Sequence, residues 1–512
     1  MKLLSDVHER NASLFPNAPA IVFGQQVISF GSHWRRLNQL ADGLHRGGAR
    51  RQDRIAMLAM NTPEYIEAYG ACERGGYIFS TVNFRLAAPE IAFVLKDSAP
   101  HTLIFEAQYA ELVDSLRSEL EIESYICLGG QTPPWALSYE EVLAAGSPEG
   151  PPFRGKPDDG VLIMYTSGTT GRPKGVLRSQ YGEARLAEVM AGQLAMTSDG
   201  RQLLMMPFFH AGSRSQYIGS FWKGGAVHMH RVFDPQLILK TIEADRITHL
   251  HLAPTMVQSI LDVPDIGDYD LSSVRTILYA AAPMPVPVLR RGLAVFGPVF
   301  ANGYGSTEVN CTCHYPHQHK LNGTPDEVRR LGSVGQPATD TDIRIVDDHG
   351  NECPAGTPGE VVARSGTALM RYWNNDKATA QSLRDGWFRT GDVGYLDDEK
   401  FLFLVDRKKD MIISGGENVY CREVEEALIT HPALSDVAVI GVPDAKWGET
   451  VKAVAVLAPG RHATQDDLIE HARSLIARYK CPKSVIFVDD LPRLPSGKVS
   501  KVILRQLYGA CL

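Results

Sequence analysis

Tyr165-Thr-Ser-Gly-Thr-Thr-Gly-Arg-Pro-Lys-Gly-Val176 is the most informative stretch of this 512-residue chain. It follows an apolar run, residues 161–164, that predicts a buried strand. Its glycines let backbone N–H groups approach an anion, while its hydroxyls and Lys174 add donors and positive charge. The spacing G-x-x-G-x-x-K is not Walker A, because Gly175 stands where Walker A needs a hydroxyl for Mg²⁺. The stretch therefore predicts a phosphate-binding loop, residues 165–176, for a nucleoside triphosphate.

Composition limits the class of protein. The chain exceeds one typical domain, and its formal net charge of −7 argues against a nucleic-acid partner. The sequence has no apolar run of about 18 residues, so we expect no membrane-spanning helix, whereas peripheral membrane contact stays open. The first residues turn polar too soon for a signal peptide, and the eight cysteines are scattered. We therefore expect a cytoplasmic protein with reduced thiols.

The chain alternates helical and strand patterns, which predicts an α/β fold. We expect a large N-terminal domain, residues 1–408, made of layered α/β subdomains plus a β-rich subdomain at about 342–406. A small, mobile α+β C-terminal domain should follow at 409–512. Within it the pattern predicts strands at 437–442 and 451–456 and a helix at 466–479.

Five further stretches place polar groups on turns. Taken alone, each has a plain structural explanation, such as a tight turn, a solvated charge cluster or a surface lysine. Their identity and order along the chain are more informative than any one of them. They are 302–308 (NGYGSTE), 387–392 (WFRTGD), 406–410 (DRKKD), 414–418 (SGGEN) and 492–498 (PRLPSGK).

Together with the phosphate loop, these stretches resemble the ordered core motifs of the adenylate-forming superfamily, and the resemblance covers nearly the whole chain. That superfamily contains acyl-CoA synthetases, aryl-CoA ligases, peptide-synthetase adenylation domains and firefly luciferases. Residues 83–86 (NFRL) and 207–210 (PFFH) are most similar to bacterial fatty-acid or aryl-acid CoA ligases. The resemblance implies that a carboxylic acid attacks the α-phosphate of ATP with Mg²⁺ present and expels pyrophosphate. CoA then displaces AMP from the acyl-adenylate.

The resemblance also implies roles for individual residues. Glu308 should hold Mg²⁺, Thr307 should contact a phosphate, and Lys498 should contact the reacting carboxylate and the bridging oxygens. The nucleotide should meet Thr166, Ser167, Gly168, Thr169, Thr170, Gly171 and Lys174 at its phosphates, Ala281, Ala282, Pro283, Tyr304 and Gly305 at its adenine, and Asp392 and Arg407 at its ribose.

In the superfamily the small domain rotates after adenylation, which the resemblance transfers to this chain with Lys409 as hinge. The rotation should remove Lys498 and present Gly415 and Gly416 to the incoming thiol. Trp447 matches an aromatic residue that contacts CoA in CoA ligases. A core tryptophan is the alternative interpretation.

His210 resembles the residue that gates or lines the acyl pocket, and a purely structural histidine is the alternative. Weaker pocket candidates are Phe209, Ser213, Gln216, Tyr217 and Gly303. Arg214 is unusual beside such apolar residues; it meets either a second polar group on the substrate or solvent, and we expect solvent. The acid should be a medium- or long-chain fatty acid or another hydrophobic acid, with aryl and sterol-derived acids open.

Residues 311–319 (CTCHYPHQH) crowd five potential metal ligands into nine positions. A tetrahedral zinc site usually uses two separated ligand pairs, and no second pair is near in sequence. We expect a loop near the acyl pocket, and a metal site stays open.

The main hypothesis is an ATP-dependent acyl-CoA ligase of fatty-acid or lipid metabolism, with a homodimer open. One alternative is an adenylating enzyme whose acceptor is a carrier-protein thiol. The other is a non-catalytic nucleotide-binding regulator on the same fold. The intact set Lys174, Glu308, Asp392, Arg407 and Lys498 argues against the regulator.

The role of Lys498 can be tested by separating the two half-reactions. Lys498→Ala should slow acid-dependent pyrophosphate release by about 10²–10³-fold, the usual effect of losing one preorganised charge. Thioester formation from a supplied acyl-adenylate should stay nearly intact. An equal loss in both half-reactions would contradict the domain-rotation assignment.

Overall fold

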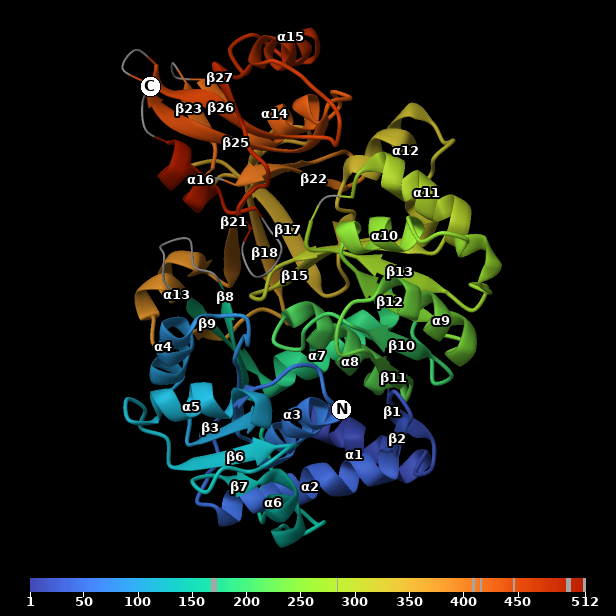
Figure 1. Cartoon of the computed structure of the whole chain (residues 1–512), viewed down its shortest axis with the longest axis vertical. Helices are drawn as coiled ribbons and strands as arrows, with labels where there is room; N and C mark the ends of the chain where they lie inside the picture. Colours follow the sequence, from blue (N-terminus) through green and yellow to red (C-terminus); the bar gives the residue numbers. More distant parts are fainter. Residues whose placement is uncertain are drawn as a thin grey trace. The chain divides into compact units, whose positions relative to one another are not determined.

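The computed structural model describes residues 1–166, 173–282, 284–407, 410–414, 417–444, 447–493 and 499–509; for Arg407, Ile413, Glu417 and Asn418 only the backbone is described. The chain forms two compact units (Figure 1). The first comprises Met1–Ile343 with Ala363–Phe388, and the second Arg344–Val362 with Arg389–Leu512. This mixed α/β architecture, large in its N-terminal part and small in its C-terminal part, confirms the predicted fold class. No helix in the described ranges combines the length and the apolarity needed to cross a membrane.

Two large sheets build the first unit, and most of their inner strands pair in parallel. Parallel strands are normally covered on both faces, which explains their near-continuous apolar runs. The nine-stranded sheet has the order β16 (Gln336–Pro337), β15 (Asn310–His314), β14 (Phe300–Gly305), β13 (Thr276–Tyr279), β12 (His249–Leu252), β10 (Arg201–Leu204), β11 (Ala226–Met229), β1 (Pro19–Phe23) and β2 (Gln26–Ser29). The eight-stranded sheet has the order β19 (Arg371–Tyr372), β9 (Lys174–Ser179), β8 (Gly160–Thr166), β4 (Ile78–Thr81), β3 (Arg54–Leu58), β5 (Thr102–Glu106), β6 (Ser124–Leu128) and β7 (Leu137–Ser138).

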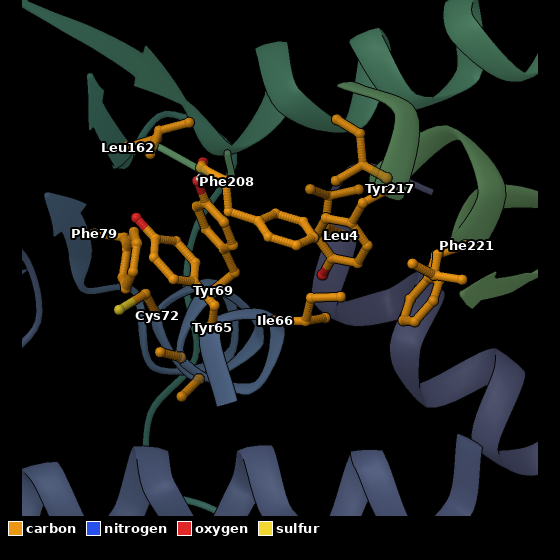
Figure 2. Close-up of a cluster of buried hydrophobic side chains, with 14 of the residues drawn as sticks. Leu4, Tyr65, Ile66, Tyr69, Cys72, Phe79, Leu162, Phe208, Tyr217 and Phe221 are labelled. Carbon is orange, nitrogen blue, oxygen red and sulfur yellow. Dashed lines mark hydrogen bonds between the residues drawn. The ribbon is translucent and has the colours of Figure 1, made fainter. Parts of the chain in front are cut away.

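Side chains alternate between the two faces of each strand, so each sheet contributes to two cores. Ile55 and Met57 of β3 face the central core, whereas Ala56 and Leu58 face a second one. The central core also includes residues of the nine-stranded sheet. Figure 2 shows the cluster of aromatic side chains around Tyr69 in this core. The helices of this central core are α1 (Leu4–Leu14), α2 (Phe30–Arg46), α3 (Pro63–Gly75), α6 (Tyr139–Ala145), α7 (Gln180–Gln193) and α8 (Ala211–Lys223).

The outer faces of the two sheets carry the remaining helices of the first unit. On the nine-stranded sheet, α9 (Pro235–Asp245), α10 (Pro254–Leu261) and α11 (Val286–Phe296) bury their apolar stripes against β10, β12 and β13. On the eight-stranded sheet, the core beyond β3 and β5 is closed by α4 (Ala88–Ser98) and α5 (Ala110–Arg117). The short helices are α6 (Tyr139–Ala145), α12 (Pro325–Arg329) and α13 (Asp376–Ser382).

The predicted β-rich stretch contains a five-stranded sheet with the order β17-β18-β21-β20, in which β22 also pairs with β21. These strands are β17 (Thr341–Val346), β18 (Gly359–Ser365), β20 (Leu383–Arg384), β21 (Trp387–Leu396) and β22 (Leu402–Arg407). A helix, α13, interrupts the stretch. The β-rich interpretation therefore describes most of these residues, with one helix that the sequence pattern did not indicate.

The C-terminal part of the second unit is a smaller sheet with helices packed against it. Val437 and Val439 face a core formed with α14 (Cys421–Leu428) and α15 (Gln465–Leu475), while Ala438 and Ile440 face α16 (Lys501–Tyr508). Its strands are β23 (Ile412–Ser414), β24 (Glu417–Val419), β25 (Leu434–Asp444), β26 (Gly448–Leu457) and β27 (Ser484–Phe487). Strands and helix thus lie where the sequence predicts them, although the helix already ends at Leu475.

A buried charge network crosses the central core between α3, α7 and α8. Arg214 is only 1 % exposed. Its guanidinium donates to Glu73 Oε1 at 2.5 Å and to Glu183 Oε2 at 2.8 Å, and its central carbon lies 4.3 Å from the ring centroid of Tyr69. The expectation that Arg214 faces solvent, or meets a substrate group, was therefore wrong. Its charge is neutralised by two carboxylates that are themselves fully buried.

Removing Arg214 should destabilise the protein strongly, because Glu73 would keep only its contact with His8 and Glu183 only that with Arg178, in a core where both carboxylates are buried. We expect Arg214→Met to lower the free energy of unfolding by about 3–5 kcal/mol, measured by urea denaturation. A surface pair provides the control: Arg291 and Asp262 are both half-exposed, and Arg291→Met should cost at most about 1 kcal/mol. Similar losses in the two variants would show that the network contributes no more than a surface ion pair.

Candidate active site

The turn between β14 and β15 carries Thr307 and Glu308. The two strands pair in antiparallel fashion, with Tyr304 opposite Thr312 and Gly305 opposite Asn310. A Cβ atom at Gly305 would lie 2.6 Å from the carbonyl oxygen of Val309, so this turn accepts only glycine there. The glycine-rich sequence thus produces the tight turn that presents the predicted magnesium ligand.

Glu308 is held by contacts from the 365–372 segment. Its carbonyl oxygen accepts from Leu369 N at 2.7 Å, and its Oε1 accepts from the hydroxyl of Tyr372 at 2.8 Å. Burial and the adjacent Glu308 carboxylate raise the pKa of Tyr372, so the phenol stays protonated and donates. The Lys174 Nζ lies 5.1 Å from the centroid of the same ring. Tyr372 therefore connects the lysine of the phosphate loop with the predicted magnesium ligand.

The donor set at Glu308 fits Mg²⁺. Magnesium usually keeps several waters and takes one or two protein carboxylates together with phosphate oxygens, so a single buried glutamate beside a phosphate loop is an adequate ligand. Across the residues that the structure describes, no three His, Cys, Asp or Glu side chains gather into a metal site that the protein alone would complete.

Sequence reasoning missed Tyr372. It is one of 18 tyrosines in the chain, and nothing in its neighbours marks it. Only the pairing of β19 with β9, which sets Tyr372 opposite Val176, brings it to the phosphate loop.

The two ends of the phosphate loop are cross-strand partners, since Thr166 of β8 pairs with Lys174 of β9. The strand predicted at 161–164 is confirmed as part of β8. Ser167, Gly168, Thr169, Thr170 and Gly171 lie outside the described residues, so their phosphate contacts stay predictions.

The predicted adenine contacts lie at the carboxyl edge of the nine-stranded sheet. Tyr279 of β13 pairs with Asn302 of β14, so Ala281 and Tyr304, each two residues further on, extend from the same edge. Ala281 has a φ of 75°, a left-handed conformation that costs a non-glycine residue about 1–3 kcal/mol and is typical of ligand-binding turns. Ala282 follows it at the surface, and Pro283 lies outside the described residues.

The 207–210 segment is fixed by two residues of the N-terminal region. Asn61 accepts from the Phe208 backbone N–H, and the hydroxyl of Tyr69 donates to the Phe208 carbonyl at 2.8 Å. Phe209 packs edge-on against Phe84 with ring centroids 5.4 Å apart, and the His210 ring lies 4.4 Å from that of Phe209. His210 is thus held against an apolar wall at the start of α8.

The remaining pocket candidates divide into two groups. Ser213 is buried and donates to the Met206 carbonyl, and Tyr217 belongs to the central core (Figure 2), with its hydroxyl against His8. The contacts of Tyr217 do not match the predicted role in the acyl pocket. Gln216 is fully buried, and Gly303 borders open space. A Cβ built on Gly303 would meet a single atom within 4 Å, from Leu278, so space is open above it.

The second unit brings the two predicted ribose ligands together. Asp392 of β21 is the cross-strand partner of Arg407 of β22. Gly391 adopts a φ of 71°, which suits glycine, and Asp392 N donates to Thr390 Oγ1 at 3.0 Å. Lys409, Gly415, Gly416 and Lys498 lie outside the described residues. Trp447 is 45 % exposed, which excludes the core-packing interpretation; its contact with CoA stays a prediction.

The expectation of a loop at residues 311–319 was wrong for residues 311–314, because Asn310–His314 form strand β15; a short 3-10 helix follows at Pro316–Gln318. Alternation along the strand sends Cys311 and Cys313 to one face and His314 to the other. His319 is also engaged, with Nδ1 near the Tyr315 carbonyl and Nε2 2.9 Å from the Tyr279 hydroxyl. Burial lowers the pKa of His319 to about 4, so the ring is neutral. These contacts account for the histidine without a metal.

Loss of the Tyr372 hydroxyl should weaken the hold on Glu308. A hydrogen bond to a charged group contributes about 1.5–3 kcal/mol, so Tyr372→Phe should raise the half-saturating Mg²⁺ concentration for pyrophosphate release by about 10- to 100-fold. Tyr77→Phe is the matched control, because Tyr77 is an equally buried tyrosine whose hydroxyl donates to the Ala41 carbonyl. If both variants show the same Mg²⁺ dependence, Tyr372 does not position Glu308.

Comparison with known proteins agrees with this geometry. Residues 8–373 match the AMP-binding enzyme family, and residues 423–498 match the AMP-binding enzyme C-terminal domain. A feruloyl-CoA synthase of Amycolatopsis is 38 % identical and an indoleacetate–CoA ligase of Aromatoleum aromaticum 36 %, each over 98 % of both chains. A long-chain-fatty-acid–CoA ligase of Mycobacterium tuberculosis is 35 % identical over 92 % of both.

Solved structures of similar proteins share the fold of this chain. An amide bond synthetase from Marinactinospora thermotolerans superposes with a TM-score of 0.89 at 27 % identity, covering 99 % of this chain and 100 % of the other. An anthranilate CoA ligase in complex with anthranoyl-AMP has a TM-score of 0.89 at 26 % identity, with coverages of 99 % and 97 %. Fold, site and sequence therefore agree: the chain belongs to the AMP-binding enzyme family and is an AMP-forming acid–thiol ligase of the acyl-CoA and aryl-CoA type, which uses ATP, Mg²⁺ and coenzyme A.

Proposed function

We propose that this ligase activates a hydrophobic acid with an aromatic body and a hydrogen-bonding group remote from its carboxylate. We propose further that the nucleotide and metal roles are those expected from the sequence. Glu308 holds Mg²⁺, Lys174 and the phosphate loop receive the pyrophosphate end, and Asp392 with Arg407 holds the ribose. Phosphoryl transfer needs positioned charge more than acid–base groups, and these residues supply it.

The observation that carries the acid class is the side chain of Gln216. It is fully buried on α8, yet within the described part of the chain neither its Oε1 nor its Nε2 has a hydrogen-bond partner. An unpaired buried amide costs about 1–3 kcal/mol, so the site favours a ligand that pairs with it. A straight hydrocarbon chain has no group that can.

A second polar group lies on the same side of α8. Gly212, one turn before Gln216, faces the ring of His251, because a Cβ at Gly212 would lie 2.5 Å from that ring. His251 is buried, and among the described residues its Nδ1 has no partner. Burial lowers the pKa of His251 to about 4, so at neutral pH the ring is uncharged and one nitrogen can accept a hydrogen bond.

The rest of the pocket supports a hydrophobic body for the acid. Phe84 and Phe209 form an apolar wall, and the space above Gly303 is bordered by Leu278. Two of the relatives are named for acids with aromatic rings, ferulate and indoleacetate.

A medium- or long-chain fatty acid is the second candidate. It is supported by the relative that is named for long-chain fatty acids. Gln216 would then pair with trapped water rather than with the substrate.

Specificity constants separate these candidates. With aromatic acids that do or do not carry a ring hydroxyl, and with medium- and long-chain fatty acids, the hydroxylated aromatic acids should give the highest kcat/KM. Gln216→Leu should lower kcat/KM for the hydroxylated acid by about 10- to 100-fold, which corresponds to one lost buried hydrogen bond, and should spare the unsubstituted acid.

Gln202→Leu is the control, since Gln202 is also a buried glutamine but lies near the amino end of β10, away from the carboxyl edge. Gln202→Leu should leave kcat/KM unchanged for both the hydroxylated and the unsubstituted acid. A higher kcat/KM with fatty acids than with any aromatic acid would contradict the proposed acid class.

A further inference from the structure

Arg178 makes contacts that link it to the predicted magnesium ligand. It lies on β9, four residues after Lys174, and is 4 % exposed. Its Nη1 donates to the carbonyl oxygen of Thr307 at 3.0 Å, and its Nη2 donates to the carbonyl oxygen of Thr367 at 2.8 Å. One guanidinium therefore bridges two backbone segments that are far apart in sequence.

These two segments are the ones that hold Glu308. Thr307 directly precedes the glutamate, and Thr367 precedes the stretch that supplies the Leu369 N–H and the Tyr372 hydroxyl to it. Arg178 thus joins the two segments at Thr307 and Thr367, and the bonds from Leu369 and Tyr372 join them again at Glu308. Both sets of bonds fix the Glu308 turn against the 365–372 segment.

The third donor of Arg178 explains how a cation is kept in the core. Its Nε donates to Glu183 Oε1, while the other oxygen of Glu183 accepts from Arg214. Glu183 therefore orients both guanidinium groups, and Glu73 balances the second. Burial alone would raise the pKa of Glu183, but Arg178 and Arg214 lower it below its usual value, so the carboxylate stays ionised at neutral pH.

Arginine suits this place better than lysine. The planar guanidinium offers donors in fixed directions, so it reaches two carbonyls and a carboxylate together. A lysine ammonium is a single nitrogen on a flexible four-carbon stem, so it has no such fork and cannot hold all three acceptors in the same geometry.

We propose that Arg178 is a positioning residue for adenylation: by joining the Thr307 and Thr367 carbonyls it sets the Glu308 carboxylate for the metal–nucleotide complex. The proposal rests on the proposed role of Glu308 as the Mg²⁺ ligand. Arg178 acts through the backbone of the turn and does not touch substrate. Arg178 is oriented by its own bond to Glu183 Oε1, whereas Arg214 pairs with the other oxygen of that carboxylate.

The test compares Arg178→Lys and Arg178→Met with Arg214→Met. Arg214→Met disrupts the same ion network but leaves both carbonyl contacts of Arg178 in place, so it is a matched control for lost stability. For each protein the thermal midpoint, the Mg²⁺ dependence of pyrophosphate release, and thioester formation from supplied acyl-adenylate are measured. Mn²⁺ affinity in the presence of α,β-methylene-ATP, followed by electron paramagnetic resonance, gives a readout that needs no turnover.

Arg178→Lys should raise the half-saturating Mg²⁺ concentration and weaken Mn²⁺ binding by about 10- to 100-fold; the shift is smaller than the full strength of two charge-assisted hydrogen bonds, because they act on the metal only through the position of Glu308. Thioester formation from the adenylate should be unchanged. Arg214→Met should lower the thermal midpoint without shifting either metal constant. Arg178→Met should show the metal effect at least as strongly as Arg178→Lys; if it does not fold, the lysine variant decides.

Equal metal constants for Arg178→Lys and the wild-type protein, or equal shifts in the Arg178 and Arg214 variants, would overturn the proposal. An equal loss of pyrophosphate release and of thioester formation in Arg178→Lys would also overturn the proposal. Failure of the proposed function looks different. In that case the wild-type protein releases no pyrophosphate with any acid, and the Mn²⁺ comparison still decides the role of Arg178.

Discussion

The pairing of buried Arg214 with Glu73 and Glu183 is the constraint on which the rest of the first unit depends. Charges inside an apolar core are tolerated only when their partners are held in place, so the network allows few relative shifts of α3, α7 and α8. The same contacts extend in two directions. Tyr69, stacked on Arg214, fixes the segment before His210, and Glu183 orients Arg178 toward the Glu308 turn. The proposed acid-binding and metal-binding segments thus share one rigid support.

Strand ends determine where the chemistry takes place. Loops that follow parallel strands emerge at one edge of a sheet, which explains how Ala281 and Tyr304 become neighbours although they are far apart in sequence. Local backbone demands then select the residue type. Gly305 is required because the Val309 carbonyl occupies the space of a side chain, whereas Ala281 accepts a left-handed φ that glycine would adopt more easily. A strained alanine next to the adenine edge indicates that the turn is held by its surroundings.

The amino-acid pattern was sufficient for features with local causes. Apolar runs beside glycine-rich turns predict β8 and the Glu308 turn, and the short apolar runs at 437–442 and 451–456 predict β25 and β26. Features with distant causes were missed. The partners of Arg214 lie 31 and 141 residues away, so an arginine in an apolar helix was interpreted as solvent-facing. Residues 311–319 suggested a ligand cluster because a list of residue types ignores the alternation of a strand, which separates neighbours.

Helix α8 shows how a buried polar group with a structural role differs from one available to a ligand. Arg214 and Gln216 are two residues apart, so they project about 200° from each other around the helix axis. Arg214 meets carboxylates from two helices, and its charge is neutralised within the fold. Gln216 is buried to the same degree, but within the described residues its amide pairs with nothing. Burial costs both side chains their hydration. Arg214 recovers bonds to two carboxylates through its Nε and Nη2, whereas neither amide atom of Gln216 has a partner among the described residues. In the function proposed above, the acid supplies the hydrogen-bond partner that Gln216 lacks within the described residues.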